Sequence, residues 1–366
     1  MQAISQSIHQ LNLSMKSLSY YVPEGRKSNQ EVIDDFLAYA GGDLSKQEQE
    51  DIMYGLNRKF RFLETYARSC IIEETGDSSI SMSVKVAKEA IQRANLQVSQ
   101  IDLLLFTGVV NPFREPTYSN MIANQLGLEG KEYYDINDTC NGFMKAIDVA
   151  SMYIATKRAQ NVLVVTCESP AEMLNEIKGN IHISTVQEAD QFMTLFLGGT
   201  GAAAVVVSEN DGHKVLQSYS ESRSSKDWDL SIIALPAVKL PEERGRQNHI
   251  LVQSDGMRTA SKIIEKMPTF VSDYLEKENV DTQSIDYVFS HQIGRNTTYA
   301  VLKKLGLDVE HRLPVNKFDQ MGNLACANIP VSLGIAMEQN LLQQGNSILL
   351  LSSSCGLNIA AMRMLW

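Results

Sequence analysis

One cysteine of this chain stands where a nucleophile is often found, in a turn between a strand and a helix. Cys140 lies in the run NDTCNGF, after the strand-like KEYYDI and before the helix-like MKAIDVASMYIATKRA. Unpaired backbone N–H groups and the helix dipole at such a position favour the thiolate, and the same N–H groups can hold a developing oxyanion. We therefore expect Cys140 to be reactive. The alternative is a small buried cysteine that only packs the joint.

Two further polar residues occupy positions that suit chemistry. His291, in SHQIGRN, follows directly after the strand-like IDYVF, and Asn323 lies in the turn QMGNLACANIP. In α/β proteins, ligands and catalytic groups collect at the carboxyl ends of the parallel strands. Taken alone, each residue has a structural alternative, as a hydrogen-bonded core histidine or a turn asparagine.

An internal repeat indicates which elements must position these side chains. The run VSQIDLLLFTGV near residue 98 is similar to TQSIDYVFSHQI near residue 282. An amphipathic helix precedes each run, and a helix ending in Leu-Gly-Leu follows it. In both copies a small-residue turn then opens a long helix that leads into an apolar strand. The shared order of five elements predicts a duplicated unit. The turns of Cys140 and Asn323 are equivalent in the two copies, so we expect a pocket between them.

Strand composition and length set the class and the boundaries. The runs LLLFTGVV, NVLVVTCE, AAAVVVSE and SILLLSSS are short and apolar throughout and alternate with helices, which indicates an α/β protein with strands buried on both faces. We expect an N-terminal half over 1–217, with a helical insertion at about 41–68. The C-terminal half would span 218–366 and begin with an irregular connector over 218–249.

Bulk properties exclude several other classes. The 366 residues are 44% apolar and carry a formal net charge of -10, which argues against non-specific binding to nucleic acid. The five cysteines contain no CxxC pair, so neither a disulfide framework nor a zinc site is expected. No apolar run is long enough to span a membrane, and the N-terminus lacks the pattern of a signal peptide. We expect a cytoplasmic protein.

Three motifs in this order resemble the β-ketoacyl-(acyl carrier protein) synthase III family of the thiolase superfamily. That family has a Cys-x-Gly-Phe turn, matched by residues 140–143, and a His-Gln pair after a strand, matched by 291–292. Its Gly-Asn-x-x-x-Ala-x-Ile-Pro motif is matched by 322–330. The resemblance runs nearly end to end. It implies the thiolase fold, in which duplicated αβα halves form a five-layer αβαβα sandwich, and it implies a homodimer.

The resemblance also implies the reaction of an acyl-thioester condensing enzyme. Cys140 would be acylated, and His291 and Asn323 would bind the carbonyl of a second thioester for a Claisen-type condensation. Backbone N–H groups of Cys140 and of the turn holding Cys355 and Gly356 would form the oxyanion hole; the family usually has glycine where Cys355 stands. Malonyl, β-ketoacyl and acyl thioesters all remain possible second substrates, in specialised polyketide or fatty-acid biosynthesis.

Two other readings remain open at this point. One is an acyltransferase that passes the acyl group from Cys140 to an alcohol or amine. The other is a non-catalytic partner subunit of a heterodimeric synthase, although an intact set of Cys, His and Asn argues against it. In each enzymatic case the substrates are thioesters of coenzyme A or acyl carrier protein, and no metal or other cofactor is required.

Glu115 is the candidate general base. The resemblance places its loop, NPFREPTYSN, across the dimer interface at the partner's acyl pocket. Relatives with a glutamate there use it to remove a proton when they join two acyl thioesters, and a carboxylate near a desolvated pocket suits that task. The alternative is a carboxylate that faces solvent or pairs with Arg114 or a lysine.

Basic residues in two segments are candidates for docking a carrier protein or coenzyme A. The alternative is an ordinary solvated face. The N-terminal segment also lacks the tryptophan that helps the fatty-acid priming enzyme to hold coenzyme A, which puts an acetyl-coenzyme A primer in doubt. The candidates are Arg58, Lys59 and Arg61 in the first segment and Arg295, Lys303 and Lys304 in the second.

Overall fold

The strands of the main sheet run through both halves of the protein. The computed structural model describes residues 9–40, 44–70, 75–109, 115–177, 183, 185–209, 214–222, 230–234 and 251–366. Within this part of the chain, nine strands are hydrogen-bonded in the order β11-β12-β13-β8-β1-β7-β6-β4-β5. The bounds are β1 (His9–Tyr21), β4 (Leu103–Thr107), β5 (Glu132–Ile136), β6 (Asn161–Glu168), β7 (Gly201–Glu209), β8 (Lys214–Ser222), β11 (Tyr287–Ser290), β12 (Ser347–Ser354) and β13 (Asn358–Leu365).

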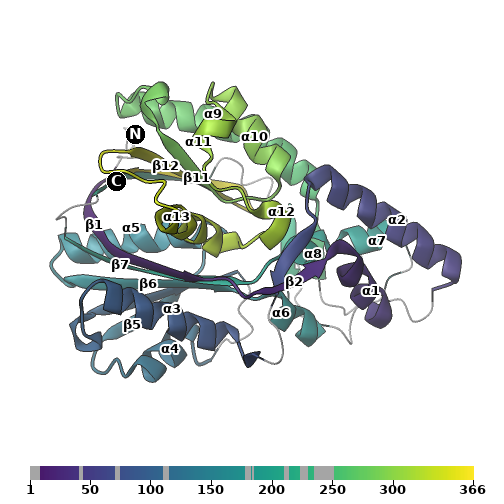
Figure 1. Ribbon diagram of the computed structural model, residues 1–366, viewed down its shortest axis with the longest axis horizontal. Helices are drawn as coiled ribbons and strands as arrows, with labels where there is room; N and C mark the ends of the chain where they lie inside the picture. Colours follow the sequence, from purple (N-terminus) through teal and green to yellow (C-terminus); the bar gives the residue numbers. More distant parts are fainter. Residues whose placement is uncertain are drawn as a thin grey trace, which may run out of the picture.

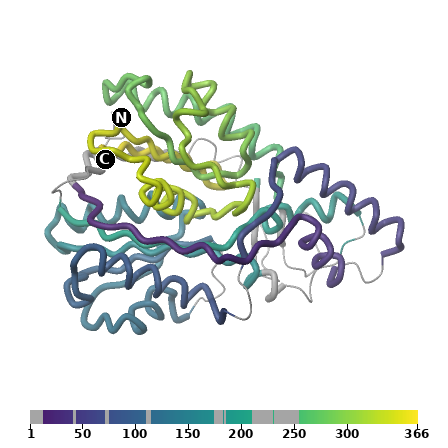
Figure 2. The backbone as a smooth tube through the Cα atoms, viewed as in Figure 1, coloured from purple at the N-terminus to yellow at the C-terminus, as the bar shows by residue number. Residues whose placement is uncertain are grey.

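The sheet order confirms the predicted duplication. Outward from β1, the first half has β7, β6 and β4, and outward from β8 the second half has β13, β12 and β11. In both halves the first two pairings are antiparallel and the third is parallel. Strands β1 and β8 pair with each other and join the halves. Figure 2 shows the halves stacked, with the first half in purple to teal below the green and yellow second half.

Helices cover both faces of each half, and two of them lie between the halves. Helices α3 and α4 pack on the outer face of the first half, and α9 and α10 pack on the outer face of the second. Helices α5 and α13 are the central layer (Figure 1). The predicted five-layer arrangement is therefore confirmed. The bounds are α3 (Ser79–Arg93), α4 (Tyr118–Leu126), α5 (Gly142–Ala155), α9 (Gly256–Lys277), α10 (Arg295–Lys304) and α13 (Asn328–Glu338).

Side chains along a buried strand point alternately into the central core and into an outer core. This explains why these strands are apolar throughout. In β6, Val162 and Val164 face the central core, whereas Leu163 and Val165 face the outer core under α3. This is the period of two that a pleated strand imposes.

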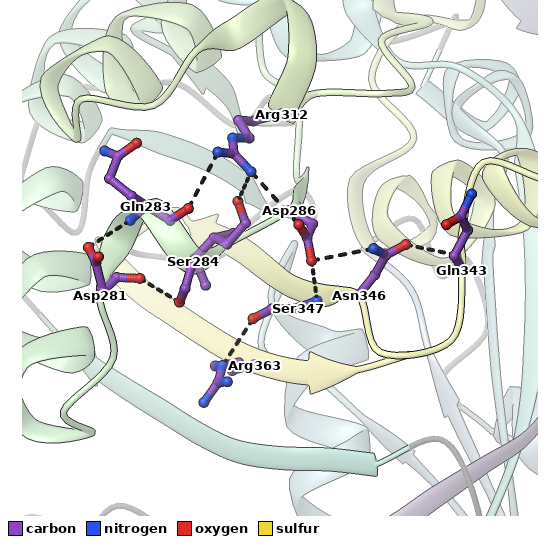
Figure 3. Close-up of polar contacts among 10 residues, drawn as sticks. Asp281, Gln283, Ser284, Asp286, Arg312, Gln343, Asn346, Ser347 and Arg363 are labelled. Carbon is purple, nitrogen blue, oxygen red and sulfur yellow. Dashed lines mark hydrogen bonds and ion pairs between the residues drawn. The ribbon is translucent and has the colours of Figure 1, made fainter.

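Matching aspartates fix the starts of equivalent strands in the two halves. Asp102 accepts the backbone N–H groups of Gln160 and Asn161 at 2.9 and 3.2 Å, just where β6 begins. In the second half, Asp286 accepts the backbone N–H of Ser347, the first residue of β12, at 2.8 Å (Figure 3). The aspartate of the repeated Ile-Asp pair thus binds the start of a neighbouring strand in both halves.

A group of helices outside the duplicated core packs together at one end of the molecule and forms a cap (Figure 1). Its helix α2 begins with a capping box in which Ser45 and Glu48 bond each other's backbone. The cap helices are α1 (Asn29–Ala40), α2 (Lys46–Leu63), α7 (Val186–Asp190) and α8 (Met193–Leu197). The remaining described strands and α-helices are β2 (Gly25–Ser28), β3 (Ala67–Cys70), α6 (Pro170–Ile177), β9 (Ser231–Ala234), β10 (Leu251–Ser254), α11 (Val309–Arg312) and α12 (Phe318–Met321).

The two special segments expected from the sequence can be located in part. The helical insertion of 41–68 contains α2 and the start of β3. The irregular connector expected over 218–249 contains regular structure instead where it is described: residues 218–222 complete β8, and 231–234 form β9. Its residues 223–229 and 235–249 lie outside the described ones. None of the described helices is both long and apolar enough to cross a membrane.

Candidate active site

The turn of Cys140 has an unusual backbone that brings the thiol to the start of α5. Thr139 adopts a φ of 43°, in the left-handed region that a β-branched residue rarely enters. Three residues later the chain passes so close to β4 that a Cβ on Gly142 would lie 1.8 Å from Oγ1 of Thr107. Only glycine fits there without displacing a neighbour. The local sequence is therefore built for this turn.

The second half repeats the turn. Ala325 has a φ of 39°, and Cys326 precedes α13 by two residues, just as Cys140 precedes α5. Asn323 stands at the entry to this second turn. The tight backbone around it depends on Gly199, whose Cβ would lie 1.8 Å from the carbonyl oxygen of Met321. Gly199, shortly before β7, is thus required by a close approach between the two halves.

His291 and Asn323 are in direct contact. His291 follows β11 and is 8% exposed, and its Nε2 lies 3.1 Å from Oδ1 of Asn323. The other ring nitrogen, Nδ1, lies 2.9 Å from the carbonyl oxygen of Ser353. The Asn323 Oδ1 atom also accepts the backbone N–H of Ala325 at 2.8 Å.

Burial keeps the imidazole uncharged. It lowers the pKa of His291 to about 4, although the contacts with Asn323 and Ser353 favour the protonated ring. A neutral imidazole has only one N–H, so it can donate to just one of the two oxygens that face it. A ring that takes up a proton donates to both, which suits a proton acceptor.

A cavity of about 620 Å³ opens onto these groups. Its polar end contains residues from both halves of the chain, and its outer walls come from α2, α7, α8 and the start of α9. Cap and core together therefore form a space large enough for an elongated ligand. The residues at the polar end are Cys140, His291, Asn323, Ser353, Ser354 and Cys355.

The electrostatic setting of Cys140 differs from the expectation of a stabilised thiolate. Burial raises the pKa of the Cys140 thiol, and the nearby Cys355, Cys326 and Glu168 raise it further. Removing the group from water outweighs the favourable position at the start of α5. The thiol and the imidazole are both neutral at rest, so loss of the thiol proton must accompany the attack on a substrate.

Hydrogen bonds between the halves fix the Cys140 turn against the hairpin of β12 and β13. Ser352 Oγ donates to the carbonyl oxygen of Cys140 at 3.2 Å. The Nδ2 atom of Asn141 donates to Ser354 Oγ at 3.3 Å and to the carbonyl oxygen of Asn358 at 3.2 Å. Sequence reasoning missed Asn141, whose only signal was its place between the cysteine and the glycine of the motif.

The turn between β12 and β13 carries Cys355 and Gly356, the residues predicted for the second part of an oxyanion hole. Cys355 lines the cavity beside Ser354, and Gly356 follows in the turn with a φ of 101°. Such a φ is readily adopted only by glycine. Cys355 therefore meets Cys140 in the same cavity, whereas Gly356 shapes the turn and is not among the residues that line it.

The remaining candidates lie at different distances from this cavity. Arg58 and Lys59 line its outer part, and Lys59 forms an ion pair with Asp190 of α7. Arg61 is exposed on the same helix, and Glu115 is exposed and does not line the cavity.

The basic residues of α10 lie outside the cavity lining. At the start of the helix Arg295 lies 3.5 Å from a carboxylate oxygen of Glu64 and donates to Tyr299 Oη at 3.0 Å. Lys303 and Lys304 are exposed at its other end. Among the described residues, no cluster of His, Cys, Asp and Glu side chains is arranged to hold a metal ion.

Comparison with known proteins agrees with the sequence motifs. Residues 134–224 match the family described as 3-oxoacyl-(acyl carrier protein) synthase III, and residues 275–366 match its C-terminal region; together the matches span half of the chain. A β-ketoacyl-(acyl carrier protein) synthase III of Clostridium perfringens is 26% identical over 356 residues, covering 96% of this chain and 98% of that protein. One from Clostridium novyi is 26% identical over 293 residues, covering 80% and 85%.

Solved structures agree in fold. Cerulenin-bound OleA of Xanthomonas campestris superposes with a TM-score of 0.79 at 19% identity, covering 100% of both chains. The 3-oxoacyl-(acyl carrier protein) synthase III of Xanthomonas oryzae also has a TM-score of 0.79 at 19% identity, covering 98% of this chain and 100% of that one. The five-layer architecture is therefore common to all three.

Proposed function

Because this chain belongs to the 3-oxoacyl-(acyl carrier protein) synthase III family, we propose that it is a condensing acyltransferase in which Cys140 carries the acyl group. The observation that carries the proposal is the shared cavity. A thiol from the first half and an imidazole from the second half line the same cavity, and that imidazole lies 3.1 Å from an asparagine amide. A nucleophile, a proton acceptor and an amide donor are thus gathered in one cavity, as acyl transfer requires.

In the first step, the Cys140 sulfur attacks the carbonyl of an acyl thioester. Since burial raises the pKa of this thiol, its proton must be removed as the new C–S bond forms. The uncharged ring of His291 is the acceptor, and once protonated it donates to both oxygens that face it. The departing thiolate takes the proton back. Backbone N–H groups of Cys140 and Cys355 would stabilise the tetrahedral oxyanion.

In the second step, another thioester binds beside the acyl group. The oxygen of the Asn323 amide is occupied by Ala325 and faces His291, so the Nδ2 atom is left to donate to the substrate carbonyl. A carbanion forms when a malonyl group loses carbon dioxide or when a base removes a proton from an acyl thioester. It attacks the acyl carbonyl on Cys140, and the enzyme thiol is released.

Glu115 is proposed as the base for the second of these routes. It would act on the partner's site in a homodimer, which is consistent with its exposure on a single chain. Strand β5 leaves one edge of the sheet open, and Tyr133 on it is 37% exposed, so a second copy could pair there. A Glu115→Gln variant should then form the acyl-enzyme at the normal rate but fail in proton removal. Turnover equal to that of the wild type would contradict this role.

Arg58 and Lys59 are proposed to meet the phosphate of a coenzyme A or carrier-protein thioester, because they line the outer part of the cavity. We propose that the reaction uses only side chains and backbone groups, without a metal or other cofactor. Turnover should therefore survive dialysis against EDTA, and loss of activity that added metal restores would contradict this.

Intact-protein mass spectrometry tests the central claim. After incubation with acyl-coenzyme A donors of different chain lengths, the wild type should gain one acyl mass, and Cys140→Ala should gain none. Cys355→Ala is the matched control, since its thiol lines the same cavity, and it should still be acylated. A mass gain that persists in Cys140→Ala but is lost in Cys355→Ala would identify Cys355 as the nucleophile instead. Carbon dioxide release after adding a malonyl thioester then separates the two condensation routes.

A further inference from the structure

A second cysteine, Cys326, is in direct contact with the turn that carries Cys140. Cys326 is 1% exposed, and its Sγ donates a hydrogen bond to the carbonyl oxygen of Thr139 at 2.7 Å. The same sulfur packs against the first residue of α5, since a Cβ added to Gly142 would lie 3.0 Å from it. Oγ1 of Thr107 lies 3.7 Å from it. One thiol of the second half therefore connects the residue before Cys140 to the helix after it.

The turn closes on the Thr139 carbonyl, which also accepts the backbone N–H of Gly142 at 3.0 Å. Thr139 has the costly left-handed backbone described above, and such conformations persist only where the surroundings hold them. The N-cap residue of α5, Asn141, makes no side-chain capping bond, because its amide donates to the hairpin of β12 and β13. Cys326 adds support from the opposite half of the protein, because its Sγ donates to the same Thr139 carbonyl.

The backbone of Cys326 is in turn bound by a buried carboxylate, that of Glu168. Oε1 of Glu168, at the end of β6, accepts the backbone N–H of Cys326 at 3.3 Å and that of Val109 at 2.9 Å. Glu168 is 1% exposed. A continuous set of contacts thus runs from the sheet of the first half through the second turn to the nucleophile.

We propose that Cys326 is a positioning residue for Cys140. Its thiol holds the turn so that the Cys140 sulfur stands at the start of α5 and faces the cavity. The proposal rests on the proposed role of Cys140 as the acylated group. A side chain at position 326 must donate to the Thr139 carbonyl, which a thiol or a hydroxyl can do and a hydrocarbon cannot.

Three substitutions at this position separate the hydrogen bonds from simple packing. Cys326→Ala removes the donor and leaves space, Cys326→Val removes the donor but fills the space, and Cys326→Ser keeps the donor. Cys167→Ala is the matched control, because that thiol is equally buried, 1% exposed, in the outer core of the first half. Two rates are followed at Cys140 by mass spectrometry of its peptide: acylation by acyl-coenzyme A, and alkylation by iodoacetamide as a function of pH.

The variants without a donor should acylate about tenfold more slowly at saturating donor, with the half-saturating concentration within about twofold of the wild type, because misplacing a reacting atom slows the chemical step more than it weakens binding. Their alkylation profile should shift to higher pH as the thiolate loses the N–H groups of α5. Cys326→Ser should restore most of the acylation rate and most of the wild-type alkylation profile. The control, Cys167→Ala, should match the wild type in both measurements.

Two outcomes would overturn the proposal: Cys326→Val acylating as fast as the wild type, or Cys326→Ser being as slow as Cys326→Val. Circular dichroism shows which variants are folded, and if Cys326→Ala is not, the comparison of Val with Ser still decides. A wild-type protein that never gains an acyl mass would instead contradict the proposed function itself, so the two failures are distinguishable.

Discussion

Replacing His291 should change the stability of the protein in a way that depends on pH. The folded protein holds this imidazole with a pKa of about 4, whereas an unfolded histidine titrates near its ordinary value of 6.5. Between these values the unfolded chain binds a proton that the folded chain refuses. His291 therefore costs no stability above about pH 7, and the protein loses stability as the pH falls toward 4.

The size of the effect follows from the two pKa values. The whole shift corresponds to about 3 kcal/mol, and linkage gives roughly 2 kcal/mol of it lost already at pH 5. His291→Gln and His291→Asn remove the titrating group, so neither variant should show this loss. Each will also lose packing and hydrogen bonds, but those losses do not vary with pH in this range.

Urea unfolding followed by circular dichroism at one protein concentration measures the effect at pH 7.5 and pH 5.0. The gap in unfolding free energy between the wild type and each variant should shrink by roughly 2 kcal/mol at the lower pH. The two variants should agree in this change even if they differ in stability at pH 7.5. A gap that stays constant would refute the idea that His291 is held neutral by burial.

Three further predictions concern the backbone of the site. Asn141→Ala should lower the unfolding free energy by about 1–3 kcal/mol, because it removes two hydrogen bonds between the halves, and it should slow acylation; urea unfolding and mass spectrometry measure both. Gly142→Ala should be strongly destabilised by its clash with Oγ1 of Thr107, and a second substitution, Thr107→Ala, should recover part of the loss in thermal unfolding. Gly199→Ala meets the backbone carbonyl of Met321 instead, so the same scan should reveal no single side-chain substitution that rescues it.

The sequence predicts the duplicated core well because the signals are local and occur twice. The Ile-Asp pairs at Asp102 and Asp286 precede equivalent strands, and each carboxylate caps the start of the neighbouring strand. Buried strands alternate with amphipathic helices at the same spacing in both copies. This alternation also supplies the crossover helix that two neighbouring parallel strands require, as α4 does between β4 and β5.

What the sequence does not predict depends on contacts between distant segments. The sign of the pKa shift at Cys140 follows from burial, and the residues responsible, such as Glu168 and Cys355, are far away in sequence. The cap shows the same limitation, since α2 and α8 pack together over a cavity although more than a hundred residues separate them. Neither helix carries a motif that indicates its partner.

The duplicated turn also explains why only one of two similarly placed thiols is suited to react. Cys140 and Cys326 each precede a central helix by two residues and each follows a residue with a left-handed backbone. Position in the fold therefore cannot distinguish them, and the surroundings must. Cys140 opens onto the cavity beside His291, whereas Cys326 is buried with its proton directed at the Thr139 carbonyl. One turn is left open to substrate, and the other is closed so that its thiol can support the first.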